Sequence, residues 1–428
     1  MEQLQKIDDG LKNGVYDRSF RKLYSEQELS LQKERYAQAL KEFHKVFPGH
    51  EKAALYSAPG RTEVGGNHTD HQHGRVLAAA VNLDVIAVVA LNDDHVIRVQ
   101  SKGFSMNVVE LDNLEIQEKE KNTSDGLIRG IAARFTQMGY QVKGFDAYTT
   151  SNVLKGSGLS SSAAFEVLIG TIISKEFCGG GVDAVEIAKI GKYSENNYFG
   201  KASGLMDQMV SSVGAFVAID FNDPENPVIE KVDFDFAACG YALCITDTKG
   251  NHANLTPDYV AVPTEMKQVA AYFQKDVLRD VPEEDFYAAL PELRKSVSDR
   301  AVLRAIHFYQ DNRRAAEEAQ ALKSGDFETF CRLVKESGDS SFKWLQNTYS
   351  PAHPEEQGVS LGLAVSERIL NGHGACRVHG GGFAGTIQAF VPLALVEEYR
   401  QEMDAVFGPS SCHVLQIREA GGVKIEKE

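Results

Sequence analysis

The spacing of hydrophobic and polar positions predicts a chain in which helices and strands are mixed. Apolar residues three and four positions apart alternate with short apolar runs that are typical of buried strands. The predicted helices cover about 25–47, 125–138, 160–177 and 182–196, and the predicted strands lie near 52–57, 76–91 and 95–99. Pro48 and Gly49 end the first helix. The polar segment before it is long, and its pattern indicates no role.

A second region is predicted to begin at FNDPENPVIE, residues 221–230, because two prolines and several turn-forming residues there indicate a change of domain. A short strand at 241–246 precedes a stretch, 264–330, in which helical spacing dominates. The last part is predicted as strand, glycine loop, strand, helix and strand, over 375–378, 385–391, 392–407 and 413–418. This order is that of half a ferredoxin-like α+β sandwich.

Composition narrows the possible partners. The chain of 428 residues carries a formal net charge of -15, which argues against nucleic acid or an anionic membrane as a partner, since both bind cationic surfaces. Six scattered cysteines without a CxxC pair indicate reduced thiols. The start of the chain lacks a signal-peptide-like segment, and no run approaches the ~18 apolar residues of a membrane helix. We therefore expect a soluble cytoplasmic protein.

The segment GSGLSSSA, residues 156–163, is the first candidate binding site. Its glycines allow the backbone to turn tightly around a bulky anion, and its serines lie where an apolar helix begins and the helix dipole is positive. The candidate phosphate-binding residues are Gly156, Ser157, Gly158, Leu159, Ser160, Ser161, Ser162 and Ala163. A helix that serine merely caps is the alternative. The sequence contains no Walker loop, protein-kinase motif set or GxSxG elbow.

A second polar cluster, APGRTEVGGNHTDHQHG at 58–74, contains Arg61, Asn67, His68 and Asp70 directly before an apolar strand. Three histidines and an aspartate so close together suggest a metal site, although such short spacing seldom lets all four side chains converge. A solvated turn is the simplest alternative. A site for a polyhydroxylated ligand fits best, because these side chains combine hydrogen-bond donors and acceptors.

Two further segments carry candidate residues. CRVHGGGFAGT at 376–386 contains GxGxxG, but a strand pattern follows it, which favours a glycine turn packed against another backbone or a ligand over a dinucleotide fold. Asp207 lies among Leu205, Met206 and Met209 after a glycine loop. It is either a carboxylate at a helix start or a base, and its burial requires a cation or hydroxyl beside it.

In this order, the segments resemble the galactokinase branch of the superfamily of galactokinase, homoserine kinase, mevalonate kinase and phosphomevalonate kinase (GHMP kinases) over nearly the whole chain. GRTEVGGNHTDHQHG is similar to the sugar motif GRxNLIGEHTDYxxG, GSGLSSSA to the phosphate loop, GLMDQMVSSVG to the segment with the catalytic acid, and GGGFAG to the third glycine loop. The resemblance implies a two-domain α+β fold. It has an extension at 1–50, an α/β domain like ribosomal protein S5 at 51–220, and a ferredoxin-like domain at 221–428.

The same resemblance implies roles for individual residues. Asp207 matches the base that takes the proton from the anomeric hydroxyl as it attacks the γ-phosphate of ATP, and Arg61 matches the arginine beside it. Glu195, with Ser161, matches the ligands of Mg²⁺, which prefers such hard oxygen donors. The positions that match the sugar-binding residues are Asn67, His68, Asp70, Gly204 and Tyr259.

Five positions depart from the family pattern. In the sugar motif Asn67 replaces Glu, Glu63 replaces Asn, and His71 replaces Tyr. Lys155 precedes the phosphate loop at a position where galactokinases often differ, and Ala384 replaces a glycine of the third loop, which requires a negative φ there. Because an amide both donates and accepts, the change at position 67 is expected to alter which hexose is preferred.

The leading hypothesis is an ATP- and Mg²⁺-dependent sugar 1-kinase, with galactose or a related hexose as acceptor and neither nucleic acid nor membrane as partner. One alternative is a non-catalytic sensor of sugar and nucleotide on the same fold. Another is a 1-kinase for a different sugar, and a third is a metal hydrolase that uses the histidines near 68–73.

Overall fold

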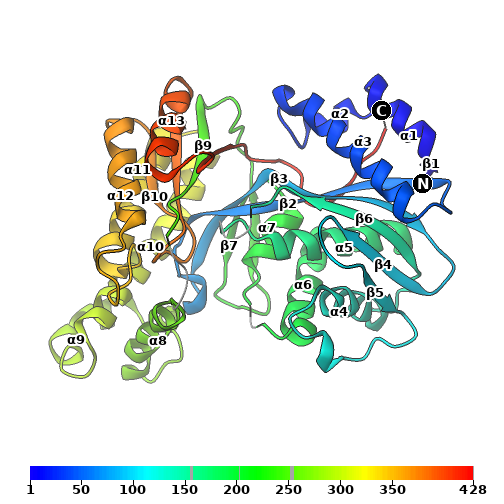
Figure 1. Ribbon diagram of the computed structural model, residues 1–428. Coiled ribbons are helices and arrows are strands. Elements are labelled where there is room, and N and C mark those ends of the chain that lie inside the picture. Colours follow the sequence, from blue (N-terminus) through cyan, green and yellow to red (C-terminus); the bar gives the residue numbers. More distant parts are fainter. Residues whose placement is uncertain (155–157, 202, 251–254, 428) are drawn as a thin grey trace.

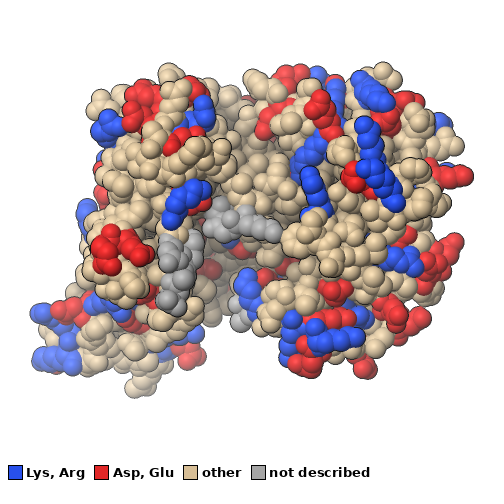
Figure 2. Space-filling view, in the orientation of Figure 1, with Lys and Arg blue, Asp and Glu red and all other residues tan. Residues whose placement is uncertain are grey.

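The protein consists of two lobes, each built on one β-sheet (Figure 1). The computed structural model describes residues 1–154, 158–201, 203–250 and 255–427. The surface is hollowed between the lobes, and acidic and basic side chains are interspersed over both of them on the face seen in Figure 2. Long strands of the larger sheet run toward the smaller lobe, so that residues of both sheets meet between them (Figure 1).

The larger sheet has nine strands and the smaller one four. The strands of the larger sheet are β1 (Glu2–Gln3), β2 (Lys52–Gly65), β3 (Arg75–Leu91), β4 (Val96–Ser101), β5 (Asn107–Glu110), β6 (Phe145–Ser151), β7 (Phe216–Asp220), β8 (Val228–Val232) and β13 (Val423–Lys424). The smaller sheet has the order β10 (Ala375–Val378), β11 (Thr386–Pro392), β9 (Tyr241–Asp247) and β12 (Cys412–Leu415). Both sheets are antiparallel except where β4 pairs with β6.

Helices cover both faces of the larger sheet. On one side lie α1 (Leu4–Asn13), α2 (Asp17–Arg21) and α3 (Leu29–Val46), and on the other α4 (Ser124–Gln137), α5 (Ser161–Phe177), α6 (Ala184–Ser194) and α7 (Met206–Val213) (Figure 1). The smaller lobe contains α8 (Thr256–Tyr272), α9 (Glu283–Leu293), α10 (Asp299–Lys323), α11 (Phe327–Ser340), α12 (Gly358–Leu370) and α13 (Val396–Phe407).

The two covered faces explain the continuous apolar run of β3. Successive side chains of a strand point to opposite faces, so a strand covered on one side only would alternate apolar and polar residues. In β3, Val85 and Val89 belong to the core that contains α5, whereas Ile86 and Val88 pack with the N-terminal helices. All four are buried, and the strand therefore has apolar residues at consecutive positions.

The N-terminal segment, for which the sequence indicated no role, forms the cover of this second face. Its helices place Ile7, Leu11 and Phe20 in one apolar cluster with Leu55 and Ile86 of the sheet. Burial of a Leu, Ile or Phe side chain stabilises a fold by about 1.5–3 kcal/mol. The segment is thus an integral layer of the larger lobe.

Asp84 on β3 anchors this layer to the sheet through buried ion pairs. Its carboxylate lies 2.5 Å from Arg35 of α3 and 3.1 Å from Arg418 near the C-terminus, and it also accepts a hydrogen bond from Tyr24. Burial alone would raise the pKa of Asp84, but the two guanidinium groups outweigh it, and the net pKa lies below its usual value. One carboxylate on β3 therefore binds three parts of the chain that are far apart in sequence, at Tyr24, Arg35 and Arg418.

The predicted elements are largely confirmed. The helix predicted over 160–177 begins at Ser161, and the strand predicted near 52–57 continues to Gly65. No helix in the described ranges is long and apolar enough to cross a bilayer. The domain boundary at residue 221 stays a prediction, and β8, which follows it, pairs with β7 of the larger sheet.

Substitution Asp84→Asn is expected to lower the free energy of unfolding by about 3–5 kcal/mol, because it leaves the buried guanidinium of Arg418 and the partly buried one of Arg35 without their counter-ion. Denaturant unfolding monitored by circular dichroism measures the loss. The control is Glu26→Gln, which removes an exposed ion pair with Arg21 and should leave the transition midpoint unchanged. Equal midpoints for the two variants would contradict the anchoring role of Asp84.

Candidate functional site

Asp207 lies at the centre of the candidate site, in contact with a cation and a hydroxyl. Its carboxylate accepts a hydrogen bond from Nε of Arg61 at 2.7 Å and another from the hydroxyl of Ser160, also at 2.7 Å. The Arg61 side chain also donates to the carbonyl of Gly158. The structure thus brings together three residues from β2, the phosphate loop and α7.

Local backbone geometry accounts for this convergence. Pairing between β2 and β3 shifts register between Pro59 and Arg61, a bulge that bends the strand next to the site. A Cβ atom at Gly60 would lie 2.8 Å from the carbonyl oxygen of Leu159, so only glycine allows β2 to approach the phosphate loop this closely. The backbone N–H of Arg61 donates to that same carbonyl at 3.0 Å.

The charge of Asp207 is set by opposing effects. Burial alone would raise the pKa of its carboxyl, but the guanidinium of Arg61 and the hydroxyl of Ser160 stabilise the ionised form, and the net pKa lies below its usual value. One third of the Asp207 side chain remains exposed, at 32%, whereas only 11% of Arg61 is exposed. Asp207 is therefore an accessible, ionised carboxylate, as the sequence required of a base.

The predicted phosphate loop precedes α5 as expected. Ser160 is the N-cap residue with a φ of 53°, and its hydroxyl donates to Asp207 rather than accepting from the first-turn amides of the helix. These amides thus remain directed outward at the positive end of the helix dipole. Lys155, Gly156 and Ser157 lie outside the described residues.

A cavity of about 670 Å³ opens beside the start of α5. Ser161 and Ser162 contribute to its lining, and Phe104, Phe165 and Phe199 contribute aromatic surface. A pocket that combines serines at a helix N-terminus with aromatic walls suits a ligand that has both an anionic and a flat apolar part.

Glu195, the expected metal ligand, follows α6 in a π-helical turn, η4 (Glu195–Phe199), and is buried. One carboxylate oxygen accepts from Lys201 at 2.9 Å, and the other accepts from the side-chain amide of Gln208, also at 2.9 Å. The same amide donates to Glu166 at 2.9 Å. Gln208 thus fixes Oε2 of Glu195, while the ammonium group of Lys201, whose side chain is 57% exposed, lies beside Oε1.

The residues expected to hold the sugar lie near the third glycine loop. His68 contacts the carbonyl of Gly381 at 3.0 Å, and the hydroxyl of Tyr259 donates to the carbonyl of Gly382 at 3.0 Å. The loop itself is the predicted strand-to-strand turn, and Ala384 has the negative φ that its replacement of glycine required. The first and third motifs are therefore packed directly against each other.

Asn67 occupies a different place from the one expected. It is fully buried, and its amide donates to Glu63 at 2.9 Å and to the carbonyl of Gly380 at 2.7 Å, while its oxygen accepts from Asn347 and Ser341. An amide has two donors and two acceptor sites, and all four are used here. Asn67 thus joins the two lobes, and its side-chain polar atoms all have partners within the protein.

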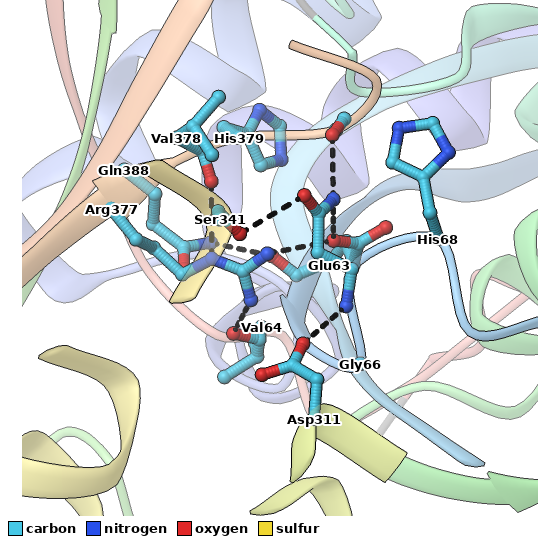
Figure 3. A network of polar contacts seen from close by, with 12 residues as sticks. Glu63, Val64, Gly66, His68, Asp311, Ser341, Arg377, Val378, His379 and Gln388 are labelled. Atoms are coloured by element: carbon cyan, nitrogen blue, oxygen red, sulfur yellow. Dashed lines mark hydrogen bonds and ion pairs between the residues drawn. The ribbon is translucent and has the colours of Figure 1, made fainter. Parts of the chain in front are cut away.

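Glu63 shares this network with Arg377, which the sequence analysis did not single out. Arg377 on β10 is fully buried and lies 2.9 Å from Oε1 of Glu63 (Figure 3). A charged residue inside the apolar strand ACRV was the available signal. Gln208 was missed in the same way, as a polar residue within an apolar run.

Asp70 and Gly204 complete the set of predicted sugar residues. A Cβ atom at Gly204 would lie 3.5 Å from Oδ2 of Asp70, so the two residues are neighbours despite their separation in sequence. Gly204 is exposed and 23% of the Asp70 side chain is exposed. Both therefore remain accessible to a ligand.

The three histidines of the motif do not converge. His68 turns toward Gly381, and its ring centroid is 6.1 Å from that of His71. Among the described residues, no three His, Cys, Asp or Glu side chains are grouped to hold a metal ion. The geometry thus gives no support to the metal-hydrolase hypothesis.

Two family models match segments that contain these residues. The galactokinase galactose-binding signature matches residues 41–91, and the N-terminal domain of GHMP kinases matches residues 126–215. A galactokinase from Glaesserella parasuis is 30% identical over 367 residues, which cover 82% of this chain and 89% of that protein. The chain belongs to the galactokinase family. A galactokinase from Streptomyces coelicolor is 28% identical over 372 residues, covering 87% of this chain and 93% of that protein.

Solved structures share the fold of this family member. The crystal structure of Lactococcus lactis galactokinase complexed with galactose superposes with a TM-score of 0.74 at 23% identity, covering 90% of this chain and 98% of that chain. Methanococcus jannaschii mevalonate kinase gives a TM-score of 0.61 at 15% identity, covering 86% of this chain and 98% of that one. The predicted two-domain GHMP kinase fold is confirmed.

Removal of the guanidinium by Arg61→Leu is expected to raise the pKa of Asp207 above its ordinary value of about 3.9, because burial then acts without a counter-charge. An NMR titration of the Asp207 carboxyl carbon measures this pKa. In the unchanged protein the carboxyl should stay ionised down to a pH below that value. The control Arg294→Leu, which removes an exposed partner of Asp299, should leave Asp207 unaffected, and an unchanged pKa in Arg61→Leu would refute the assignment.

Proposed function

We propose that this chain transfers the γ-phosphoryl group of ATP to the anomeric hydroxyl of a hexose, with galactose the leading acceptor. The observation that carries this proposal is the accessible, ionised carboxylate of Asp207, paired with Arg61 and joined to Ser160 at the start of α5. A base for the acceptor and a binding site for the phosphate donor are thereby adjacent.

In the proposed reaction Asp207 accepts the proton of the anomeric hydroxyl. That oxygen forms a bond to the γ-phosphorus, the bond from this phosphorus to the bridging oxygen breaks, and ADP leaves with the electron pair. Arg61 lies where it keeps Asp207 ionised and also offsets negative charge on the transferred group. Membership of the galactokinase family supports the assignment as a kinase.

The cavity beside α5 is proposed to bind the nucleotide. The part of its lining formed by Ser161 and Ser162 suits the phosphates, because the first-turn amides and the dipole of α5 both favour anions. Its aromatic residues offer a surface on which a nucleobase can pack.

Glu195 and Ser161 are proposed to hold the Mg²⁺ that accompanies ATP. The donor set fits a hard cation, since Glu195 presents one oxygen fixed by Gln208 and a second that a cationic ammonium group already occupies. When bound, the metal neutralises phosphate charge. The protein supplies the fixed carboxylate, and Lys201, mostly exposed, is free to turn away.

The acceptor is proposed to lie near Asp70 and Gly204, two neighbouring predicted sugar residues that remain accessible. The Lactococcus lactis enzyme was crystallised with galactose, and the curated relatives are galactokinases, which supports galactose here. We further propose a cytoplasmic location, consistent with a net charge of -15 and with the lack of a membrane-spanning helix in the described ranges.

The direct test is incubation of the purified protein with Mg-ATP and a panel of monosaccharides, with ADP as the readout and phosphorus NMR to identify the sugar 1-phosphate. Galactose is expected to give turnover. Absence of turnover with every sugar would overturn the proposal. Sugar-dependent thermal stabilisation without ADP would instead indicate the non-catalytic sensor.

Substitution Asp207→Asn is expected to lower kcat by at least ~100-fold, because an amide cannot accept the proton. Steady-state kinetics with galactose measures the effect. Sugar binding, followed by thermal shift, should persist. A variant that keeps more than about one tenth of the rate would exclude Asp207 as the base.

Substitution Gln208→Met is expected to raise the Mg²⁺ concentration needed for half-maximal activity by about 10–100-fold, because the partner that orients Glu195 is lost. Calorimetric titration of Mg-ATP gives a second readout that does not depend on turnover. The matched control is Gln320→Met on the exposed face of α10, which should change neither value. A Gln208→Met variant with unaltered Mg²⁺ dependence would exclude this positioning role.

A further inference from the structure

The sugar motif of this chain has exchanged an amide and a carboxylate between two positions that touch. The family pattern has Asn where this chain has Glu63, and Glu where it has Asn67. In the structure the two side chains are joined by a hydrogen bond of 2.9 Å. The pair therefore still holds one amide and one carboxyl group, but the carboxyl group now lies at position 63 instead of position 67.

The carboxylate at its new position is held by one oxygen only. Oε1 of Glu63 accepts from both Asn67 and Arg377, each at 2.9 Å. Neither of these hydrogen bonds involves Oε2. Within the described part of the chain, Oε2 has no hydrogen-bond partner and is not fully buried. The remaining 9% exposure of the Glu63 side chain therefore includes this oxygen.

The open oxygen borders the catalytic centre. Burial raises the pKa of the Glu63 carboxyl to about 7, and the charges of Arg61 and Asp70 also act on it. Glu63 also lies on the same strand as Arg61, two positions along, on β2. A rigid acceptor oxygen is thus presented beside the place proposed for the anomeric hydroxyl.

We propose that Oε2 of Glu63 accepts a hydrogen bond from a ring hydroxyl of the acceptor sugar and so determines which hexose is bound. This inference rests on the proposed sugar 1-kinase function. Asn67 and Arg377 fix the carboxylate in place, so that little side-chain freedom is lost when the sugar binds. The acceptor is a neutral sugar, because the carboxylates of Asp70 and Asp207 would repel an anionic sugar acid.

The test compares Glu63→Gln with the unchanged protein on galactose and on each monodeoxy analogue. The variant keeps the size of the side chain but replaces the carboxylate. It should lower kcat/KM about 10- to 100-fold for galactose, and for every analogue that retains the recognised hydroxyl. For the one analogue that lacks it, the two proteins should have similar kcat/KM values. Loss of the same factor on all sugars would overturn the proposal.

Ser341→Ala is the matched control, because it removes another member of the buried network that contacts Asn67 and leaves Glu63 in place. It should not change the ratio between any two sugars. A thermal shift with each sugar in the absence of ATP repeats the comparison without turnover. If the unchanged protein binds sugars selectively but releases no ADP, the kinase proposal fails while the role of Glu63 is still tested.

A double exchange provides a second test. Asn67→Glu alone places two carboxylates in contact and should lower activity. Adding Glu63→Asn restores one carboxylate and one amide. The double variant should be at least about tenfold more active than Asn67→Glu alone, and its order of sugar preference should differ from that of the unchanged protein. Recovery with an unchanged order, or no recovery, would contradict a role for the exchanged pair in sugar selection.

Discussion

The buried ion pair between Arg377 and Glu63 is the contact on which the meeting of the two sheets depends. Arg377 belongs to the smaller sheet and Glu63 to the larger one, and neither charge could stay buried alone, since an unpaired ion in a protein interior costs several kcal/mol. The two sheets must therefore meet in one arrangement. That arrangement also places the third glycine loop against the sugar motif, so packing and binding geometry have a common origin.

The elements of the fold were largely predictable because their signals are local. Helical spacing and the serine run located the start of α5 to within one residue. The first two helices, α1 and α2, were not predicted, although Ile7 and Leu11 of α1 lie four positions apart. Their charged neighbours concealed the pattern, and only the apolar second face of the larger sheet explains why these helices fold.

The candidate site was predictable where a residue's own chemistry demanded a partner. Asp207, surrounded by apolar residues, required a cation or hydroxyl, and the structure provides both. Arg377 and Gln208 were missed because their function depends on side chains that only tertiary folding brings near. Asn67 shows the reverse case: the residue was correctly seen as unusual, but its burial between the lobes could not be read from the sequence.

The two ends of the chain lie close together on one strand (Figure 1). β1 pairs with β2 at Lys52 and Ala53, and β13 pairs with the same strand at Tyr56 and Ser57. Arg418, from the same terminal region as β13, completes the ion pairs of Asp84. Because the chain is synthesised from its N-terminus, residues 2–91 of the larger lobe are made long before Arg418 and β13, so this lobe cannot complete its packing until the residues of the smaller lobe have also been made.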